Sequence, residues 1–343
     1  MSEPLHYLDE FELGGGMRPT WRSWLLHIGL LLATICTATI AGVLYPFGKT
    51  DIFPQDDPQS FGEFVSFAGS LPAKYYDLIS GVLHQLATNQ DGILVYGLSF
   101  SLSLLFILIS HEMGHYVACR IYKVDATLPF FIPTPPMIGP AGTFGAFIKI
   151  LSPLPSPRAV FDIGVAGPIA GFIALIPVAF VGIATMHTMS PEQAVNAQGG
   201  LVFSDPLLMK SIALLFGKDL HFGIGNPFYY AAWVGLLVTA LNLIPSGQLD
   251  GGHAIYAVLG KRIHYWTGRI AFAVMATLSI LGWFLYGSPS GFLIAILLGV
   301  MMKIPHPEPY DQTPLDSKRK LIALATLVIF ILCFVPFPIQ ISS

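Results

Sequence analysis

The sequence predicts an all-α, polytopic membrane protein with about seven transmembrane helices. Of its 343 residues, 54% are hydrophobic and only 11% are charged, whereas about a quarter of the residues in an average soluble domain are charged. Seven apolar stretches approach or exceed the length needed to cross a hydrocarbon core of about 30 Å. They cover residues 24–45, 93–119, 159–185, 228–244, 268–286, 289–303 and 321–337.

Charge and cysteine content exclude several kinds of partner and site. A net charge of -3 spread over few charged residues provides no basic face for nucleic acid, so no nucleic-acid partner is expected. Cys36, Cys119 and Cys333 lie far apart in apolar runs, which favours packing over metal binding or disulfide formation. The acidic residues before the first apolar stretch differ from the basic start of a secretory signal, so this stretch is expected to remain as an anchor.

The first part of the chain is expected to hold a tail, an anchor and an external segment. Residues 1–23 form the predicted cytoplasmic tail, and residues 24–92 contain the first span and a long external connection. Within that connection, residues 61–86 have the pattern of an amphipathic helix lying along the outer interface. An ordinary folded external loop is an equally open interpretation.

Residues 93–260 form the predicted membrane core, which includes an unusual inner connection. Residues 121–158 are apolar but contain eight prolines, so they cannot be one helix and are too apolar for a solvated loop. Non-helical backbone at membrane depth is tolerated only where protein or a water-filled cavity covers it. We therefore expect Gly142–Ile150 to form a strand or hairpin that dips toward the membrane from the inner side.

Residues 261–343 contain the remaining predicted transmembrane helices. Only residues 287–289 separate the fifth apolar stretch from the short sixth one. The two therefore form either a hairpin of two spans or one span with a re-entrant segment. Before them, residues 201–217 are interrupted by an acid, a proline and a lysine and are expected to form an interfacial or surface helix.

Lysine and arginine collect in cytoplasmic loops and so indicate orientation. If the N-terminus lies inside, 13 of the 17 lysines and arginines are on the inner side. The outer side holds only Lys49, Lys74, Lys210 and Lys218. This distribution predicts a multi-pass protein with a cytoplasmic N-terminus, an external C-terminus and an odd number of spans.

One apolar stretch contains ionisable residues. His111 and His115 are four residues apart, so on a helix they project from one face, with Glu112 beside them. This HExxH spacing suits two ligands of a tetrahedral zinc ion and a general base. Such histidines can instead hydrogen-bond to neighbouring helices, but three ionisable groups in a span are costly unless they face a site. Arg120 is expected to mark the inner membrane interface. The two histidines lie about 7 to 14 Å from it along the helix, so the site is expected near the cytoplasmic side.

A third zinc ligand is expected at the inner end of the fourth apolar stretch. Asp250 follows Pro245 in a glycine-rich turn, and its carboxylate can turn back to join the two histidines. Asp250 could instead cap the following helix, and His253 and His264 are alternative third ligands. A set of two histidines and one aspartate could also hold other divalent metals.

These motifs resemble those of the site-2 proteases, a family of intramembrane zinc metalloproteases. The resemblance covers about residues 93–260. It is carried by His111-Glu-Met-Gly-His115, by Asn242-Leu-Ile-Pro245 running into Leu249-Asp250-Gly251, and by the glycine-rich elements Gly142-Thr-Phe-Gly-Ala146 and Ala166-Gly-Pro-Ile-Ala-Gly171.

The resemblance implies a role for each matching residue. It implies that His111, His115 and Asp250 bind Zn²⁺ and that Glu112 activates the attacking water. Asn242 is similar to a residue that helps to hold the substrate or the oxyanion. The substrate would pair with an edge strand formed by residues 142–150, with Gly142, Thr143, Phe144 and Gly145 as substrate-binding residues.

The implied function is hydrolysis of peptide bonds within or near transmembrane segments of membrane-protein substrates in the lipid bilayer, that is, regulated intramembrane proteolysis. The alternative is a divalent-metal transporter or channel that uses the same His/Glu/Asp cluster. That alternative needs polar groups through the outer half of the spans, but the outer halves of 93–119 and 228–244 provide serines and no carboxylate or histidine. An inactive scaffold is a third possibility, against which the intact Glu112 argues. We expect no PDZ-like or CBS-like regulatory domain, and the oligomeric state is not predicted.

Overall fold

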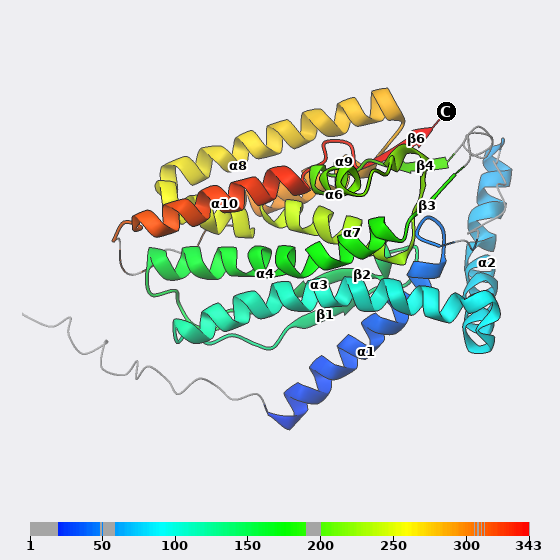
Figure 1. Ribbon diagram of the computed structural model, residues 1–343, viewed down its shortest axis with the longest axis horizontal. Coiled ribbons are helices and arrows are strands. Elements are labelled where there is room, and N and C mark those ends of the chain that lie inside the picture. Colours follow the sequence, from blue (N-terminus) through cyan, green and yellow to red (C-terminus); the bar gives the residue numbers. More distant parts are fainter. Residues whose placement is uncertain are drawn as a thin grey trace, which may run out of the picture.

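A computed structural model describes residues 20–48, 50, 59–189, 200–304, 306, 309, 311 and 313–342. In this part of the chain, long helices lie side by side along the length of the molecule, and helix α2 (Phe61–Thr88) runs across one end of them (Figure 1). The predicted cytoplasmic tail, residues 1–23, lies outside the described residues except for its last four.

Among the described residues, four helices are long and apolar enough to cross a membrane. They are α1 (Trp21–Val43), the continuous helical stretch Gln90–Ile121 that ends with α3 (Ile93–Ile121), α4 (Pro157–Ala184) and α8 (Asp250–Tyr286). They correspond to the first, second, third and fifth predicted spans, within two residues at the ends where a span runs past its helix. The predicted helical class is confirmed, with four candidate membrane spans.

The other three predicted spans form shorter helices. Helices α7 (Pro227–Asn242), α9 (Ser290–Met301) and α10 (Ser317–Cys333) have 16, 12 and 17 residues. At 1.5 Å per residue they are about 18 to 26 Å long, less than the hydrocarbon core of a bilayer. Helix α9 follows a turn at Gly287, where φ is +61°, and packs back against α8, which fits both the hairpin and the re-entrant alternative.

The main apolar core lies where α4 meets α3 and α7. Phe100 and Leu104 of α3, Leu175 of α4 and Leu236 of α7 are completely shielded from solvent. Small residues on α4 let the helices approach closely. A Cβ atom at Gly182, for example, would lie 2.6 Å from the backbone nitrogen of Tyr229.

The proline-rich connection contains the predicted hairpin. Strand β1 (Phe130–Pro133) pairs antiparallel with β2 (Thr143–Phe147), and a short 3-10 turn, Pro140–Gly142, precedes β2. One extra residue on β2 produces a bulge between the paired positions. Gly145 lies in this bulge with a φ of +92°, and its N–H donates to the hydroxyl of Thr143 at 3.0 Å.

Helix α1 holds the hairpin from one side. The ring nitrogen Nδ1 of His27 donates to the carbonyl of Pro129 at 2.8 Å. The hydroxyl of Thr37 donates to the carbonyl of Gly142, also at 2.8 Å. A Cβ atom at Gly142 would lie only 2.4 Å from the carbonyl oxygen of Thr37, so this glycine is required by the contact with α1.

The end of the molecule near α2 carries the small remaining elements. Residues 61–88 form a helix, in agreement with the amphipathic interpretation. The helix expected over 201–217 is only partly correct, because α6 covers Leu207–Leu215 and Gly200–Phe203 forms strand β4. Strand β4 pairs with β6 (Ile339–Ser342), a partner far away in the sequence, and β3 (His187–Thr188) pairs with β5 (Gly223–Ile224).

Candidate metal centre

Helix α3 carries two histidines and a glutamate into the interior of the protein. His111, Glu112 and His115 are 4, 6 and 8% exposed. The two imidazole rings lie one helical turn apart, with centroids separated by 4.9 Å. Three ionisable side chains are thus buried at one place in a membrane-type helix.

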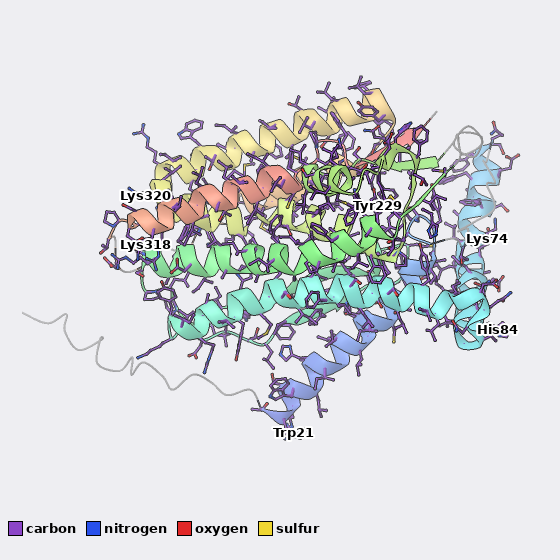
Figure 2. The ribbon with its side chains drawn as sticks, in the orientation of Figure 1. Trp21, Lys74, His84, Tyr229, Lys318 and Lys320 are labelled. Atoms are coloured by element: carbon purple, nitrogen blue, oxygen red, sulfur yellow. The ribbon has the colours of Figure 1, made fainter. Side chains whose placement is uncertain are left out.

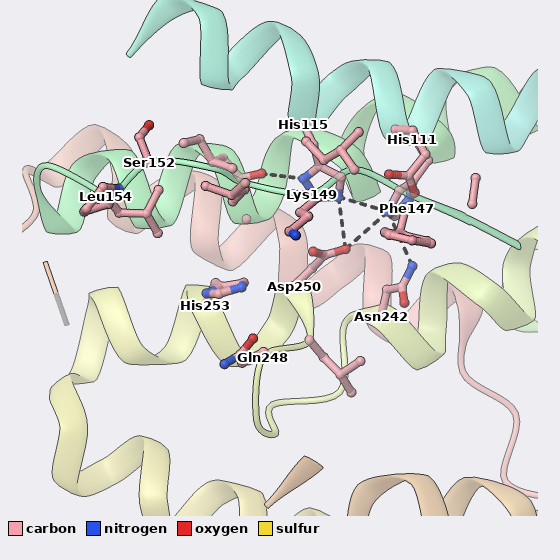
Figure 3. A pocket seen from close by; sticks show the side chains of 18 residues that line it. His111, His115, Phe147, Lys149, Ser152, Leu154, Asn242, Gln248, Asp250 and His253 are labelled. Carbon is pink, nitrogen blue, oxygen red and sulfur yellow. Dashed lines mark hydrogen bonds and ion pairs between the residues drawn. The ribbon is translucent and has the colours of Figure 1, made fainter. Parts of the chain in front are cut away.

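Asp250 reaches this place because α7 and α8 are packed tightly at the turn that joins them. Asp250 is the first residue of α8. A Cβ atom at Gly251 would lie 2.1 Å from the carbonyl oxygen of Leu243, and one at Gly252 would lie 2.4 Å from that of Gly247. The two glycines therefore let the start of α8 lie against the end of α7, which directs the Asp250 carboxylate toward α3 (Figure 3).

Three ligand atoms converge between these helices. Nε2 of His111 lies 3.1 Å from Nε2 of His115, and Oδ2 of Asp250 lies 3.2 Å and 3.4 Å from these nitrogens. Zinc bonds of 2.0–2.2 Å in tetrahedral geometry separate neighbouring ligand atoms by about 3.3 Å. The three side chains therefore fit a zinc ion, and they form the one group of this kind found among the described residues.

The carbonyl of Ile163 in α4 sets the orientation of one ligand. It lies 2.6 Å from Nδ1 of His115, and because a carbonyl can only accept, Nδ1 carries the proton. Nε2 is then left with its lone pair facing the cluster, which is the usual arrangement of a metal-binding histidine. On the other ligand, Nδ2 of Asn242 lies 3.4 Å from Nε2 of His111.

A row of glycines on α4 forms one wall of the centre. A Cβ atom at Gly167 would lie 2.1 Å from Nε2 of His115, and one at Gly171 would lie 3.1 Å from Cβ of His111. The element Ala166–Gly171 noted in the sequence therefore has a packing role, since only glycine leaves room for the imidazole rings.

A cavity of about 610 Å³ opens beside the ligands. Glu112, Asn242 and residues 146–150 line it. The chain just after β2 thus borders the same cavity as the glutamate, with Lys149 at the cavity wall (Figure 3).

The structure brings together some predicted site residues and separates others. His111, Glu112, His115, Asn242 and Asp250 meet at the cavity. Within the hairpin strand β2 and the chain that follows it, the cavity is lined by residues 146–150. The predicted substrate-binding residues Gly142, Thr143, Phe144 and Gly145 precede this segment and are not part of the lining.

The alternative third ligands lie outside the cluster. His253 lines the cavity, but its Nδ1 lies 2.8 Å from Nε2 of His306. Nε2 of His264 donates to the carbonyl of Gly247 at 3.0 Å. Sequence reasoning missed the Ile163 carbonyl, because a backbone group has no residue-type signature. The predicted segment 142–150 does reach the cavity, but through its second half, residues 146–150.

The fold and the cluster define a helical membrane protein with a buried group of two histidines and one aspartate that can hold a metal ion. Residues 99–282 match the model of peptidase family M50. The chain therefore belongs to this family, and the resemblance to the site-2 proteases is confirmed. Its apolar helices and its family make it an integral membrane protein.

Plant proteins described as chloroplastic are similar to the chain. The probable zinc metalloprotease EGY1 of Arabidopsis thaliana is 30% identical over 246 residues, which are 70% of this chain and 43% of that protein. EGY1 of Oryza sativa subsp. japonica is 29% identical over 68% of this chain and 39% of its own length. The probable zinc metalloprotease EGY2 of Arabidopsis thaliana is 28% identical over 280 residues, which are 80% of this chain and 47% of that protein.

The chain thus spans less than half the length of these curated relatives. No solved structure matches it significantly.

Proposed function

We propose that the protein is an intramembrane zinc metalloprotease that hydrolyses peptide bonds within or near transmembrane segments of other membrane proteins. The observation that carries this proposal is the meeting of His111, His115 and Asp250 at 3.1 to 3.4 Å beside a buried glutamate. The cavity next to them is bounded by non-helical backbone. The names of the similar plant proteins as zinc metalloproteases support the proposal.

In this proposal, His111, His115 and Asp250 hold Zn²⁺. When bound, zinc supplies Lewis-acid chemistry, activating water and polarising the carbonyl of the scissile peptide bond. Two histidines and one carboxylate leave a fourth position for water, as in catalytic zinc sites. The Ile163 carbonyl keeps the His115 ring turned toward the ion.

Glu112 acts as the general base. Its carboxylate is buried and lies at the cavity wall beside the ligands. It accepts a proton from the attacking water and passes this proton to the nitrogen of the leaving amine. Residues 146–150 line the same cavity, so a substrate backbone paired with them would lie beside this carboxylate.

The non-helical segment beside the cavity binds the substrate. A transmembrane helix hides its peptide bonds in its own hydrogen bonds, so it must unwind before it can be cut. Pairing of the freed strand with the backbone of residues 142–150 would offset the lost hydrogen bonds. Gly142, Thr143, Phe144 and Gly145 shape the approach to the cavity, and the amide of Asn242 donates to the developing oxyanion.

The orientation proposed from the sequence places the metal centre near the cytoplasmic side. Figure 2 shows Lys318 and Lys320 at the end of the molecule opposite to Lys74 and His84 of α2. This separation supports an orientation with the start of α10 on the inner side and α2 along the outer surface. Cysteines introduced at Lys318 and Lys74 would then react with an impermeant thiol reagent from opposite sides of sealed membranes.

The test of the function compares the wild-type protein with Glu112→Gln in detergent. Metal content and cleavage of a panel of single-span substrates are measured on the same samples. We expect about one zinc ion per chain in both proteins, with cleavage lowered by about 10²- to 10⁴-fold in the variant. Chelation should abolish wild-type cleavage and added zinc should restore it.

A second experiment, with the protein in liposomes, addresses the transport alternative. Uptake of zinc into liposomes by the wild-type protein, without cleavage of any substrate, would contradict the proposal. The outer half of α3 does not favour an ion path, because Phe100 and Leu104 are buried there. The hydroxyl of buried Ser101 is hydrogen-bonded to that of Thr39 at 2.8 Å.

A further inference from the structure

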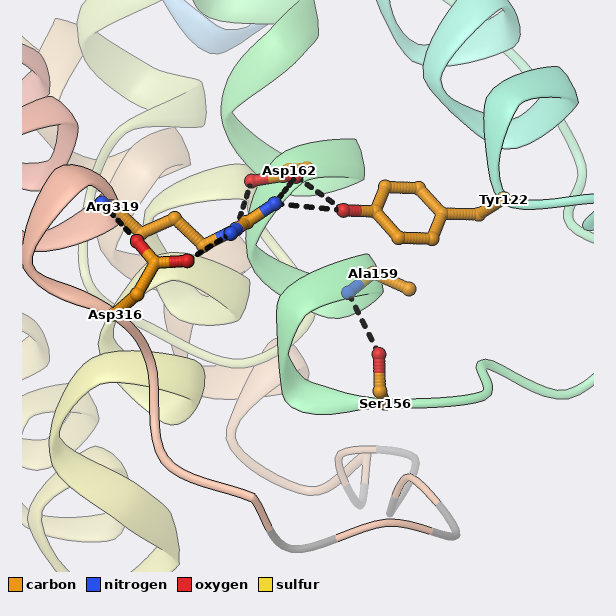
Figure 4. A network of polar contacts seen from close by, with 6 residues as sticks. All are labelled: Tyr122, Ser156, Ala159, Asp162, Asp316 and Arg319. Atoms are coloured by element: carbon orange, nitrogen blue, oxygen red, sulfur yellow. Dashed lines mark hydrogen bonds and ion pairs between the residues drawn. The ribbon is translucent and has the colours of Figure 1, made fainter.

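A network of charged side chains joins three helices at the end of the bundle where α10 begins. Arg319 of α10 donates from Nε to Oδ1 of Asp162 at 2.9 Å and from Nη2 to Oδ2 at 2.6 Å (Figure 4). This two-pronged geometry is the strongest form of an Arg–carboxylate contact. The side chains of Arg319 and Asp162 are 22 and 25% exposed, so the pair is largely shielded from water.

Two further side chains complete this network. The Tyr122 hydroxyl, at the end of α3, donates to Asp162 and accepts from Nη2 of Arg319 at 3.0 Å. Asp316 caps α10 by accepting from the backbone N–H of Arg319 at 3.0 Å, and it also binds the guanidinium. Asp162 is thereby tied to both α3 and α10.

Asp162 directly precedes the residue that orients the metal centre. The carbonyl of the next residue, Ile163, accepts the hydrogen bond from His115. The same turn of α4 also packs closely against α8, the helix that carries Asp250, because a Cβ atom at Gly164 would lie 2.7 Å from Cβ of His253. The position of the first turns of α4 therefore determines where the His115 ring points.

We propose that Arg319 is a positioning residue for the metal centre. By gripping Asp162, it holds the start of α4 at the place where the Ile163 carbonyl directs Nε2 of His115 toward the zinc ion. This inference rests on the proposed function of His111, His115 and Asp250 as metal ligands. It assigns a role in the metal site to α10, which lies outside the region 99–282 that matches the family.

A purely structural role of the ion pair makes a different prediction. Removing one partner of a shielded pair leaves the other charge unpaired and lowers stability, and this alone would leave the geometry of the folded site unchanged. The decisive measurements are therefore metal affinity and ligand geometry in the folded protein.

The experiment uses the full chain with Arg319→Met, Arg319→Lys and, as control, Arg262→Met, which removes a charge from an exposed position on α8. Zinc affinity is measured by competition with a chromophoric chelator, and Co²⁺ is bound to report ligand geometry through its visible spectrum. Thermal unfolding of each metal-free protein is recorded in parallel.

We expect Arg319→Met to bind zinc about tenfold or more weakly, as found for partners that orient metal ligands, and to shift the Co²⁺ spectrum. Arg319→Lys keeps the positive charge but cannot make the two-pronged contact with Asp162. Its zinc affinity should fall between those of Arg319→Met and the wild type. Arg262→Met should match the wild type. If Arg319→Met does not yield folded protein, the affinity and spectrum of Arg319→Lys decide the question.

Two outcomes separate this inference from the proposed function. Wild-type zinc affinity and an unchanged Co²⁺ spectrum in folded Arg319 variants would overturn the positioning role, even if their unfolding temperature falls. Failure of the wild-type protein to bind zinc or Co²⁺ through His115 would instead overturn the proposed function.

Discussion

The Nδ1 atom of His115 lies 2.6 Å from the carbonyl oxygen of Ile163, a residue 48 positions later in the chain. This contact leaves Nε2 of His115 facing Asp250 before any metal binds, since the carbonyl can only accept. Preorganisation of this kind strengthens metal binding, because the ring need not be reoriented when the ion arrives. The metal centre therefore depends on the packing of α4 as well as on the HExxH motif.

Replacement of Gly167 by alanine should damage the metal centre. The new Cβ atom would lie 2.1 Å from Nε2 of His115, so the ring must move away from the position at which it faces Asp250. We expect zinc affinity to fall by about tenfold or more and cleavage to fall with it, measured by chelator competition and a substrate assay.

Two other glycines serve as controls for this substitution. Gly171→Ala brings its Cβ only to 3.1 Å from His111 and should have a smaller effect. Gly81→Ala in α2 meets no neighbouring atom within 4 Å and should bind zinc as the wild type does. Equal zinc affinity in Gly167→Ala and Gly81→Ala would show that the His115 ring does not contact a metal.

Substitution of Asp250 tests the identity of the third ligand. Asp250→Asn keeps the size of the side chain but replaces the anionic oxygen with a weaker ligand, so the purified protein should lose most of its zinc. His253→Gln should retain about one zinc per chain, because His253 lies outside the three-atom cluster. Metal loss in His253→Gln with retention in Asp250→Asn would reverse the assignment.

Asn242→Ala should separate catalysis from metal binding. The Asn242 amide lies 3.4 Å from His111 and borders the cavity, where it can donate to a developing oxyanion. Loss of such a donor lowers the rate constant by about 10²- to 10³-fold, while the three ligands remain in place. Elemental analysis and cleavage kinetics check this, and wild-type cleavage by the variant would remove Asn242 from the mechanism.

Gly145→Ala should lower cleavage without removing zinc. Gly145 lies in the bulge of β2 with a φ of +92°, where a side chain costs about 1 to 2 kcal/mol and distorts the strand that leads to the cavity. The matched control is Gly217→Ala, at a φ of +60° and with open space around it, which introduces similar strain at the end of α6.

The comparison of these two variants gives a clear decision. If both lower cleavage equally, general destabilisation explains the effect and the hairpin has no special part in substrate binding. Loss of zinc from Gly145→Ala would likewise contradict an edge-strand role.

Most of the candidate metal centre was predictable from residue types and spacing. His111 and His115 lie one turn apart on any helix, and three ionisable groups within an apolar stretch indicate a site. Asp250 was predictable from its expected side of the membrane, although the alternatives His253 and His264 could be separated from it only by their positions in the structure.

The fold was predictable to a lesser extent. Long apolar runs predicted the four helices that are long enough to span a membrane, whereas the stretches 228–244 and 289–303 form helices of only 16 and 12 residues. Strand β4 was missed because its hydrogen-bond partners, residues 339–342, are more than a hundred residues away. Local patterns contain no information about such a partner.

By itself, the sequence determined that the protein belongs in a membrane, which side chains are candidate metal ligands, and which family it resembles. Composition, ligand types and motif spacing are properties of the chain alone. Tertiary structure decided which of the possible ligands meet, which backbone carbonyl orients His115, and which part of the hairpin borders the cavity. These features depend on the packing of α4 against α3 and α8 through glycine contacts of a few ångströms. Only the folded chain brings such distant groups within hydrogen-bonding distance.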